Sequence, residues 1–109
     1  MGDHYLVNLY GCNPLRLDDQ GFIRETLELA CHTGRLNILN MMMHKFEPQG
    51  VTAIALLSES HISIHTWPEN KTAACDVYTC GETADPKSVV EYLKERFDAE
   101  ESKVEYIKR

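Results

Sequence analysis

Hydrophobic and polar positions alternate along most of this 109-residue chain, and this alternation predicts β-strands. Residues 4–11 are rich in Tyr, Leu and Val, whereas residues 51–57 are almost wholly apolar and are predicted to form a buried strand. The segments predicted as strands are 4–11, 35–46, 51–57, 61–67, 72–80 and 103–108. In 35–46, the even positions Leu36, Ile38, Met42 and Phe46 are expected to share one face.

Two other segments have the three- to four-residue spacing of amphipathic helices. Asp18 and Asp19 can cap the first helix and Gly34 can end it, while Asp85-Pro86 is a strong start for the second. The apolar faces comprise Phe22, Ile23, Leu27 and Ala30 in the first helix, and Val89, Val90, Leu93 and Phe97 in the second.

The order of these elements predicts an α+β fold. Four consecutive strands without intervening helices favour a mostly antiparallel sheet, and two helices can cover only one of its faces. We therefore expect residues 1–109 to form a single domain, a two-layer α/β sandwich. The other face of the sheet must also be covered, and a second copy of the chain would do so in a four-layer dimer.

Composition narrows the class of protein. The formal charge of −6 and the lack of a basic stripe argue against nucleic-acid binding. We find no apolar stretch that could form a membrane helix and no signal peptide, so we expect a cytoplasmic protein with reduced cysteines. The four cysteines form no CxxC pair, and alternation directs Cys75 and Cys80 to opposite faces. We therefore expect no metal site.

Candidate chemistry is concentrated in residues 58–69 (SESHISIHTWPE), which hold hydroxyl, imidazole and carboxylate groups. If residues 68–71 form a hairpin loop, His61 faces Tyr78, His65 faces Ala74 and position 59 lies opposite Cys80. His61, His65 and Cys80 then share one side of the sheet. Ser60 nominally points to the other side, but it lies at a bend where alternation need not hold.

Each of these residues also has a purely structural interpretation. Cys80 could be a small buried hydrophobe, Phe46 a core residue and Glu69 a turn residue. A hydrolase built on Ser60, His65 and Asp76 is disfavoured, because the sequence has no GxSxG elbow. Residue types and spacing alone leave the reaction undecided.

The stretch from Ser58 to Glu69, continued by DVYTCGE at 76–82, resembles the prokaryotic S-adenosylmethionine decarboxylases. The resemblance extends to HKF at 44–46, PQGV at 48–51, GDH at 2–4 and YGC at 10–12, and so covers most of the chain. The combination SESH…HTWPE…TCG is highly specific. In its short length, the chain resembles the class of these decarboxylases that does not need magnesium.

The resemblance implies a proenzyme that cleaves itself between Glu59 and Ser60 into residues 1–59 and 60–109. Ser60 would become a pyruvoyl group, the cofactor that forms a Schiff base with the substrate. In this family His65 corresponds to the processing base. Thr52 stands where many relatives have a serine that assists processing.

The resemblance also assigns roles in catalysis. Cys80 corresponds to the proton donor, Phe46 to the residue that stacks on adenine and Glu69 to the carboxylate that binds the ribose hydroxyls. The product would be the aminopropyl donor for spermidine synthesis, made at sites on a dimer interface.

Two alternatives remain open from the sequence. The first is a pyruvoyl-dependent arginine or ornithine decarboxylase, in which Asp3 would contact the cationic side chain of the substrate. The second is a binding or regulatory protein that never processes itself. Phe46 and Glu69 favour the nucleoside substrate, and the presence of Ser60, His65 and Cys80 together favours an enzyme.

Overall fold

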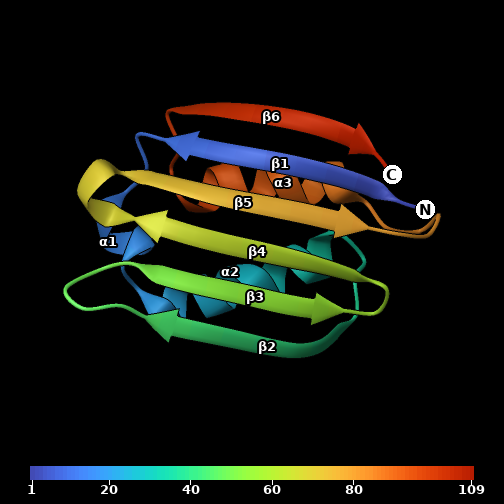
Figure 1. Ribbon diagram of the computed structural model, residues 1–109, viewed down its shortest axis with the longest axis horizontal. Helices are drawn as coiled ribbons and strands as arrows, with labels where there is room; N and C mark the ends of the chain where they lie inside the picture. Colours follow the sequence, from blue (N-terminus) through green and yellow to red (C-terminus); the bar gives the residue numbers. More distant parts are fainter.

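The computed structural model describes residues 1–109, and six of its segments are strands. These are β1 (Asp3–Tyr10), β2 (Ile38–Lys45), β3 (Val51–Leu57), β4 (Ser60–Trp67), β5 (Thr72–Thr79) and β6 (Glu101–Lys108). They form one sheet in the order β2-β3-β4-β5-β1-β6 (Figure 1), and every neighbouring pair is antiparallel. The predicted strands are all present, and the sheet is wholly rather than mostly antiparallel.

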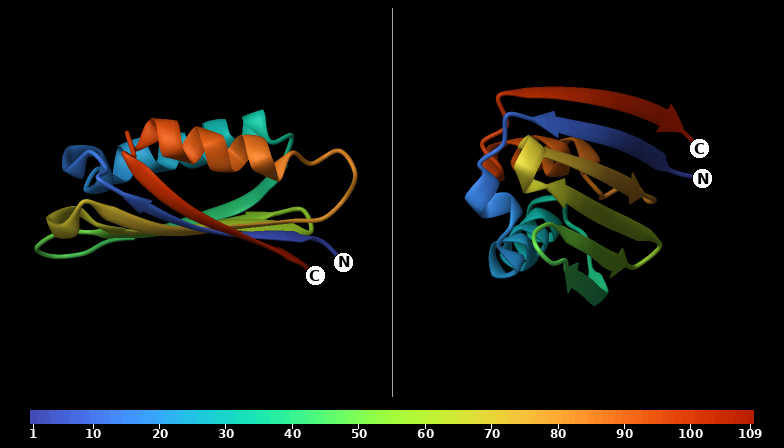
Figure 2. Two further views of the ribbon diagram at one scale, coloured as in Figure 1. Left: turned by 90° about the horizontal axis from the view of Figure 1, so that it is seen from above. Right: turned by 60° about the vertical axis from the view of Figure 1, so that its left-hand side comes forward.

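Three helices cover one face of the sheet (Figure 2): α1 (Pro14–Leu17), α2 (Gln20–Thr33) and α3 (Pro86–Arg96). The predicted caps are confirmed, because Asp19 accepts a hydrogen bond from the Phe22 amide at 2.9 Å and Asp85 from the Ser88 amide at 3.2 Å. The short helix α1, capped by Asn13, was not predicted, since four residues are too few for a periodic pattern. None of the helices has the length and apolar character needed to span a membrane.

The hydrophobic core lies between the sheet and the helices. Alternate residues of β1, β3, β4 and β5 are buried, as strand geometry requires when one face is covered. The largest fully buried side chains of the core are Phe97, Leu9, Leu17, Ile23, Leu27, Leu57, Ile62, Ile64 and Leu93. Burying a side chain of this size contributes about 1.5–3 kcal/mol. Because the core is enclosed between a single sheet and the helices on one of its faces, the predicted two-layer α+β sandwich is confirmed.

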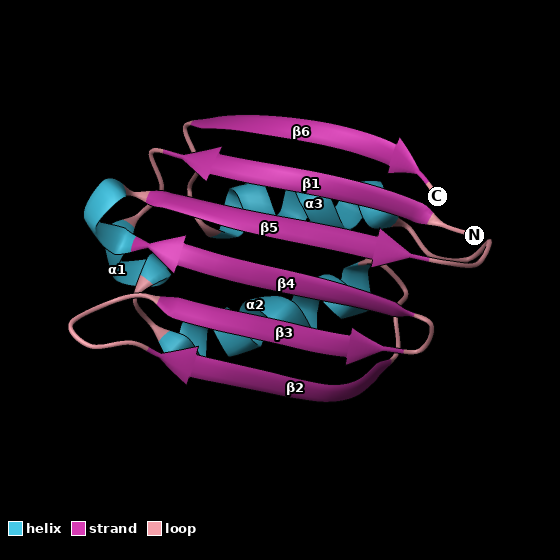
Figure 3. Ribbon diagram, viewed as in Figure 1, coloured by secondary structure: helices cyan, strands magenta, loops and turns pink.

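The opposite side of the sheet, which we call the open face, has no helix over it (Figure 3). It nevertheless carries large apolar side chains that are at least one-third exposed. These are Leu6, Tyr10, Met42, Ile54, Leu56, Trp67 and Ile107. Apolar side chains gathered on one face are typical of a surface that contacts another protein.

Strand β2 differs from the sequence prediction. A register shift between Ile38 and Asn40 reverses which residues face the core, so Met41 and Met43 pack against the core. The even positions beyond the shift face away from the helices, and Met42 is 73% exposed. The expectation of one continuous face through Leu36, Ile38, Met42 and Phe46 was therefore wrong.

Candidate active site

The Glu59-Ser60 bond lies at the end of the tight turn between β3 and β4. Leu57 pairs with Ser60, which leaves only Ser58 and Glu59 in the loop. Glu59 has a φ of 62°, a left-handed conformation that costs a non-glycine residue on the order of 1 kcal/mol. Backbone strain is therefore present at the residue that precedes Ser60.

The Ser60 side chain is nearly buried and contacts the end of β5. Its hydroxyl oxygen accepts a hydrogen bond from the Cys80 amide at 3.2 Å, and Ser60 is 7% exposed. The neighbouring register agrees with the prediction, because His61 pairs with Tyr78 and His65 with Ala74. The structure therefore brings residue 60 and Cys80 together, as the hairpin loop predicted.

Cys80 differs from the other cysteines in its environment. All four are free, but Cys12, Cys31 and Cys75 are buried and Cys80 is partly exposed. Burial raises the pKa of the Cys12 and Cys31 thiols to about 11, and it raises the pKa of Cys75 still further. Cys80 is therefore the thiol with access to a ligand on the open face.

A second group of expected site residues lies at the other end of the strands. Thr52 pairs with His65 across β3 and β4, and the Thr52 hydroxyl lies 3.2 Å from His65 Nδ1. Trp67 stacks on the His65 ring, with centroids 6.5 Å apart. Glu69 is exposed in the 3₁₀ turn Pro68–Asn70 that follows Trp67.

Phe46 belongs to this second group and is held in a short loop. It is 44% exposed and packs edge-to-face on His44, with ring centroids 4.6 Å apart. The loop from 46 to 50 is closed by a hydrogen bond from the Phe46 amide to the Gly50 carbonyl at 2.8 Å. Asp18 fastens it further, since its carboxylate accepts from the Gly50 amide at 2.8 Å and from Lys45 Nζ at 3.0 Å.

The two groups are well separated within one chain. Ser60 and His65 are five residues apart on the same extended strand, so their Cα atoms are about 16 Å apart. In Figure 1 the turn before Ser60 and the end of β5 are at the right, whereas the β2–β3 loop and the turn after β4 are at the left. A hollow of about 340 Å³ lies on the open face between them, lined in part by Ser63, His65 and Asp76.

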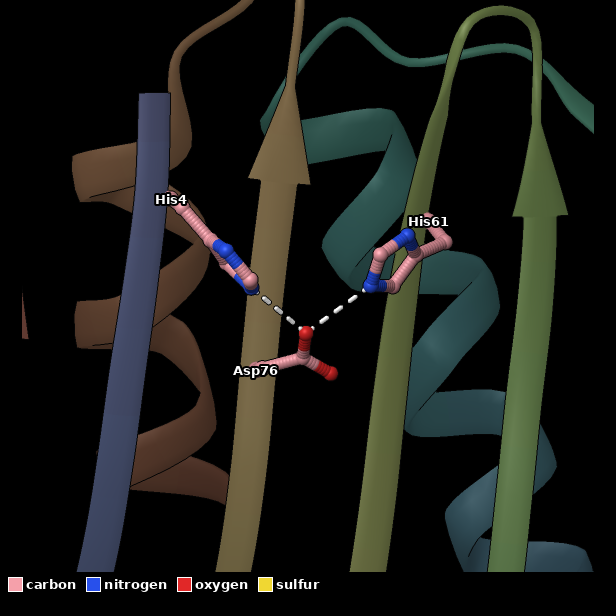
Figure 4. A group of neighbouring side chains, drawn as sticks. All are labelled: His4, His61 and Asp76. Carbon is pink, nitrogen blue, oxygen red and sulfur yellow. Dashed lines mark hydrogen bonds and ion pairs between the residues drawn. The ribbon is translucent and has the colours of Figure 1, made fainter. Parts of the chain in front are cut away.

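The open face also carries a polar cluster that the sequence analysis did not predict. The Nε2 atoms of His4 on β1 and His61 on β4 lie 2.7 and 2.8 Å from Asp76 Oδ2 on β5 (Figure 4). Ser63 donates to the other carboxylate oxygen. Burial raises the pKa of Asp76, but the hydrogen bonds from Ser63, His4 and His61 outweigh this and hold it below its usual range.

Comparison with known proteins gives consistent matches over almost the entire chain. The family model for S-adenosylmethionine decarboxylase matches residues 3–109. An S-adenosylmethionine decarboxylase proenzyme from Parasynechococcus marenigrum (strain WH8102) is 48% identical over 100 residues, which is 92% of this chain and 78% of the relative. The proenzyme from Pyrococcus horikoshii is 45% identical over 109 residues, covering 100% of this chain and 78% of the relative.

A solved structure is also very similar to this fold. The crystal structure of the adenosylmethionine decarboxylase from Aquifex aeolicus VF5 superimposes with a TM-score of 0.94 at 35% sequence identity. The match covers 100% of this chain and 90% of that one. The similarity therefore extends to every element described above.

Proposed function

We propose, from the premise that this chain belongs to the S-adenosylmethionine decarboxylase family, that it is a proenzyme which cleaves itself before Ser60 and then decarboxylates S-adenosylmethionine. The family and the enzyme class predicted from the sequence are both confirmed. The observation that best supports the cleavage is the strained turn at Glu59, with the Ser60 hydroxyl fixed beside Cys80.

The proposed cleavage uses atoms of the chain and one water molecule. The Ser60 hydroxyl attacks the Glu59 carbonyl, and the peptide bond is replaced by an ester. Loss of the Ser60 α-proton then breaks the bond between Ser60 Cβ and the ester oxygen. This step releases residues 1–59 with a carboxylate at Glu59 and leaves dehydroalanine at position 60, an enamine that isomerises to an imine. Water hydrolyses the resulting imine, ammonia leaves, and residues 60–109 begin with a pyruvoyl group. Left-handed backbone at Glu59 favours the first step by destabilising the uncleaved turn.

The pyruvoyl group derived from Ser60 supplies a carbonyl that accepts electrons when carbon dioxide leaves the substrate. We assign Cys80 as the proton donor to the substrate carbon, because its amide contacts Ser60 Oγ and its side chain is accessible. We assign His65 as the base that removes the Ser60 α-proton, with Thr52 as its hydrogen-bond partner at 3.2 Å.

His65 cannot reach Ser60 of its own chain across about 16 Å, so we propose that each site is shared by two copies of the chain. Two copies could be related by a two-fold axis that is parallel to the sheets and perpendicular to their strands. This axis would stack the open faces and place the Ser60 end of one sheet over the His65 end of the other. The exposed apolar side chains of the open face would be covered in this homodimer of cleaved protomers. The resulting assembly would have the four layers expected from the sequence.

The second group of residues suits a nucleoside substrate. We propose that Phe46 stacks on adenine and that Glu69 accepts hydrogen bonds from the ribose hydroxyls, since both are exposed near His65. Arginine or ornithine is disfavoured, because the Asp3 carboxylate already binds Tyr106 and Lys108 of β6. The product would be the aminopropyl donor for spermidine synthesis.

We place the reaction in the cytoplasm as part of the same proposal. All four cysteines are free, and the Cys80 thiol must stay reduced in order to donate a proton.

The test is release of labelled carbon dioxide from S-adenosylmethionine, arginine and ornithine in parallel. We expect release from S-adenosylmethionine alone, and none from the Ser60→Ala variant. Phe46→Ala should raise KM for S-adenosylmethionine. Release from arginine or ornithine alone would refute the substrate assignment, and release by Ser60→Ala would refute the pyruvoyl mechanism.

A further inference from the structure

In the His4–His61–Asp76 cluster, the contact with Arg109 indicates which nitrogen of His4 carries the ring proton. The Arg109 Nη1 atom lies 3.2 Å from His4 Nδ1, and a guanidinium group can only donate a hydrogen bond. His4 Nδ1 is therefore the acceptor, and the ring proton is on Nε2, which faces Asp76. Residues of these types can bind a metal ion. Binding would require the lone pair of His4 Nε2, but that nitrogen carries the ring proton. The cluster is thus a hydrogen-bond network centred on the Asp76 carboxylate.

This network includes the residue next to the one that reacts. His61 follows Ser60 in the sequence, and its ring is held between the Asp76 carboxylate and the Tyr78 ring, with centroids 5.8 Å apart. Ser63, two residues further along β4, donates to the same carboxylate. Asp76 therefore holds His61 and Ser63, the first two side chains of β4 after the turn that point to the open face.

The proposed cleavage changes what holds residue 60. In the uncleaved chain, the turn through Ser58 and Glu59 connects β4 covalently to β3. After cleavage residue 60 is a chain end, and chain ends fray unless other contacts hold them. The side-chain anchor from His61 to Asp76 is unaffected by the cut, because both residues belong to the fragment 60–109.

His4 adds a link between the two fragments. It lies on β1, in the fragment 1–59, yet it donates to the same Asp76 oxygen as His61 does. We propose that Asp76 is a positioning residue that holds the reacting end of β4 in place once the chain has been cut, an inference that rests on the proposed function. Its contribution should therefore be larger in the cleaved protein than in the uncleaved one.

The test compares Asp76→Asn in two backgrounds, the self-cleaving chain and the uncleaved Ser60→Ala chain. In the cleaved protein we expect kcat to fall on the order of 10- to 100-fold with little change in KM, since a 1 Å displacement of a reacting group costs on the order of 100-fold. Amide hydrogen exchange at residues 61–63 should accelerate in the cleaved protein and change little in the Ser60→Ala background. His61→Phe, which keeps an aromatic ring against Tyr78 but cannot donate to Asp76, should reproduce the loss of kcat.

Several results would overturn this inference. An unchanged kcat in both variants would show that the network does not position the chain end. Equal acceleration of exchange in the two backgrounds would show a general structural role. If Asp76→Asn does not fold, an active His61→Phe variant would also refute the inference. Intact mass measured first on the wild-type protein separates the cases, because a chain that stays whole contradicts the proposed function itself.

Discussion

A site shared between two chains makes a prediction about mixed dimers. In the proposed assembly, Cys80 of one chain works with His65 of the other. Two variants, Cys80→Ala and His65→Ala, should each be inactive as homodimers, because loss of a general acid or base costs about 10²- to 10⁴-fold. When one chain carries each substitution, one of the two sites in the dimer contains both substitutions and the other contains none.

The magnitude follows from this count of sites. A heterodimer of Cys80→Ala with His65→Ala should have about half the activity of a wild-type dimer, since one of its two symmetry-related sites is intact. A matched control places both substitutions on one chain and pairs it with a wild-type chain. Each site in that heterodimer lacks one of the two groups, so the control should be inactive.

The assay uses coexpression of two differently tagged chains, tandem purification of the heterodimer and measurement of carbon dioxide release per dimer. If each site were instead built within one chain, the two heterodimers would exchange their results: the control would keep about half of the activity and the Cys80→Ala/His65→Ala pair would have none. That outcome would refute the shared site and the roughly 16 Å separation on which it depends.

Three other predictions follow from the same structure. Asp18→Ala should raise KM with little effect on kcat, measured by steady-state kinetics, because its carboxylate fastens the loop that carries Phe46. Iodoacetamide should label only Cys80 in the native protein, as read by peptide mass mapping, since the other three thiols are buried and their pKa values are raised. The pKa of Asp76 is lowered on folding, so its contribution to the free energy of unfolding is present above pH about 4 and is lost as the pH falls through the folded value. Denaturant unfolding should therefore show the difference between wild type and Asp76→Asn shrinking below pH about 4, and a constant difference would contradict the assignment.

Local patterns were sufficient to predict the hairpin that carries the site. The length of the turn after Trp67 and the alternation of β4 and β5 set the pairing of His61 with Tyr78. The number of helices predicted the open face, because two helices can cover only one side of the sheet. The separation of Ser60 from His65 also follows from the strand prediction, because five residues of extended strand have a fixed length of about 16 Å.

Other features depend on contacts that local patterns do not encode. The register shift in β2 adds a residue at Leu39, and periodicity alone cannot locate such an irregularity. The Asp76 network requires β1 to lie beside β5, with Leu6 opposite Asp76. These strands are far apart in sequence, so no turn length fixes their pairing and His4 carried no signal. Asp18 likewise contacts Gly50 through tertiary packing rather than through any motif.

The intact mass of the purified protein tests the central claim most directly, which is that this chain makes its own reactive carbonyl. Wild-type protein should separate under denaturing conditions into residues 1–59 and a fragment 60–109 that begins with a carbonyl group and has no free amine. Ser60→Ala should remain a single chain of about 12.5 kDa. A wild-type chain that stays whole after prolonged incubation would contradict the account.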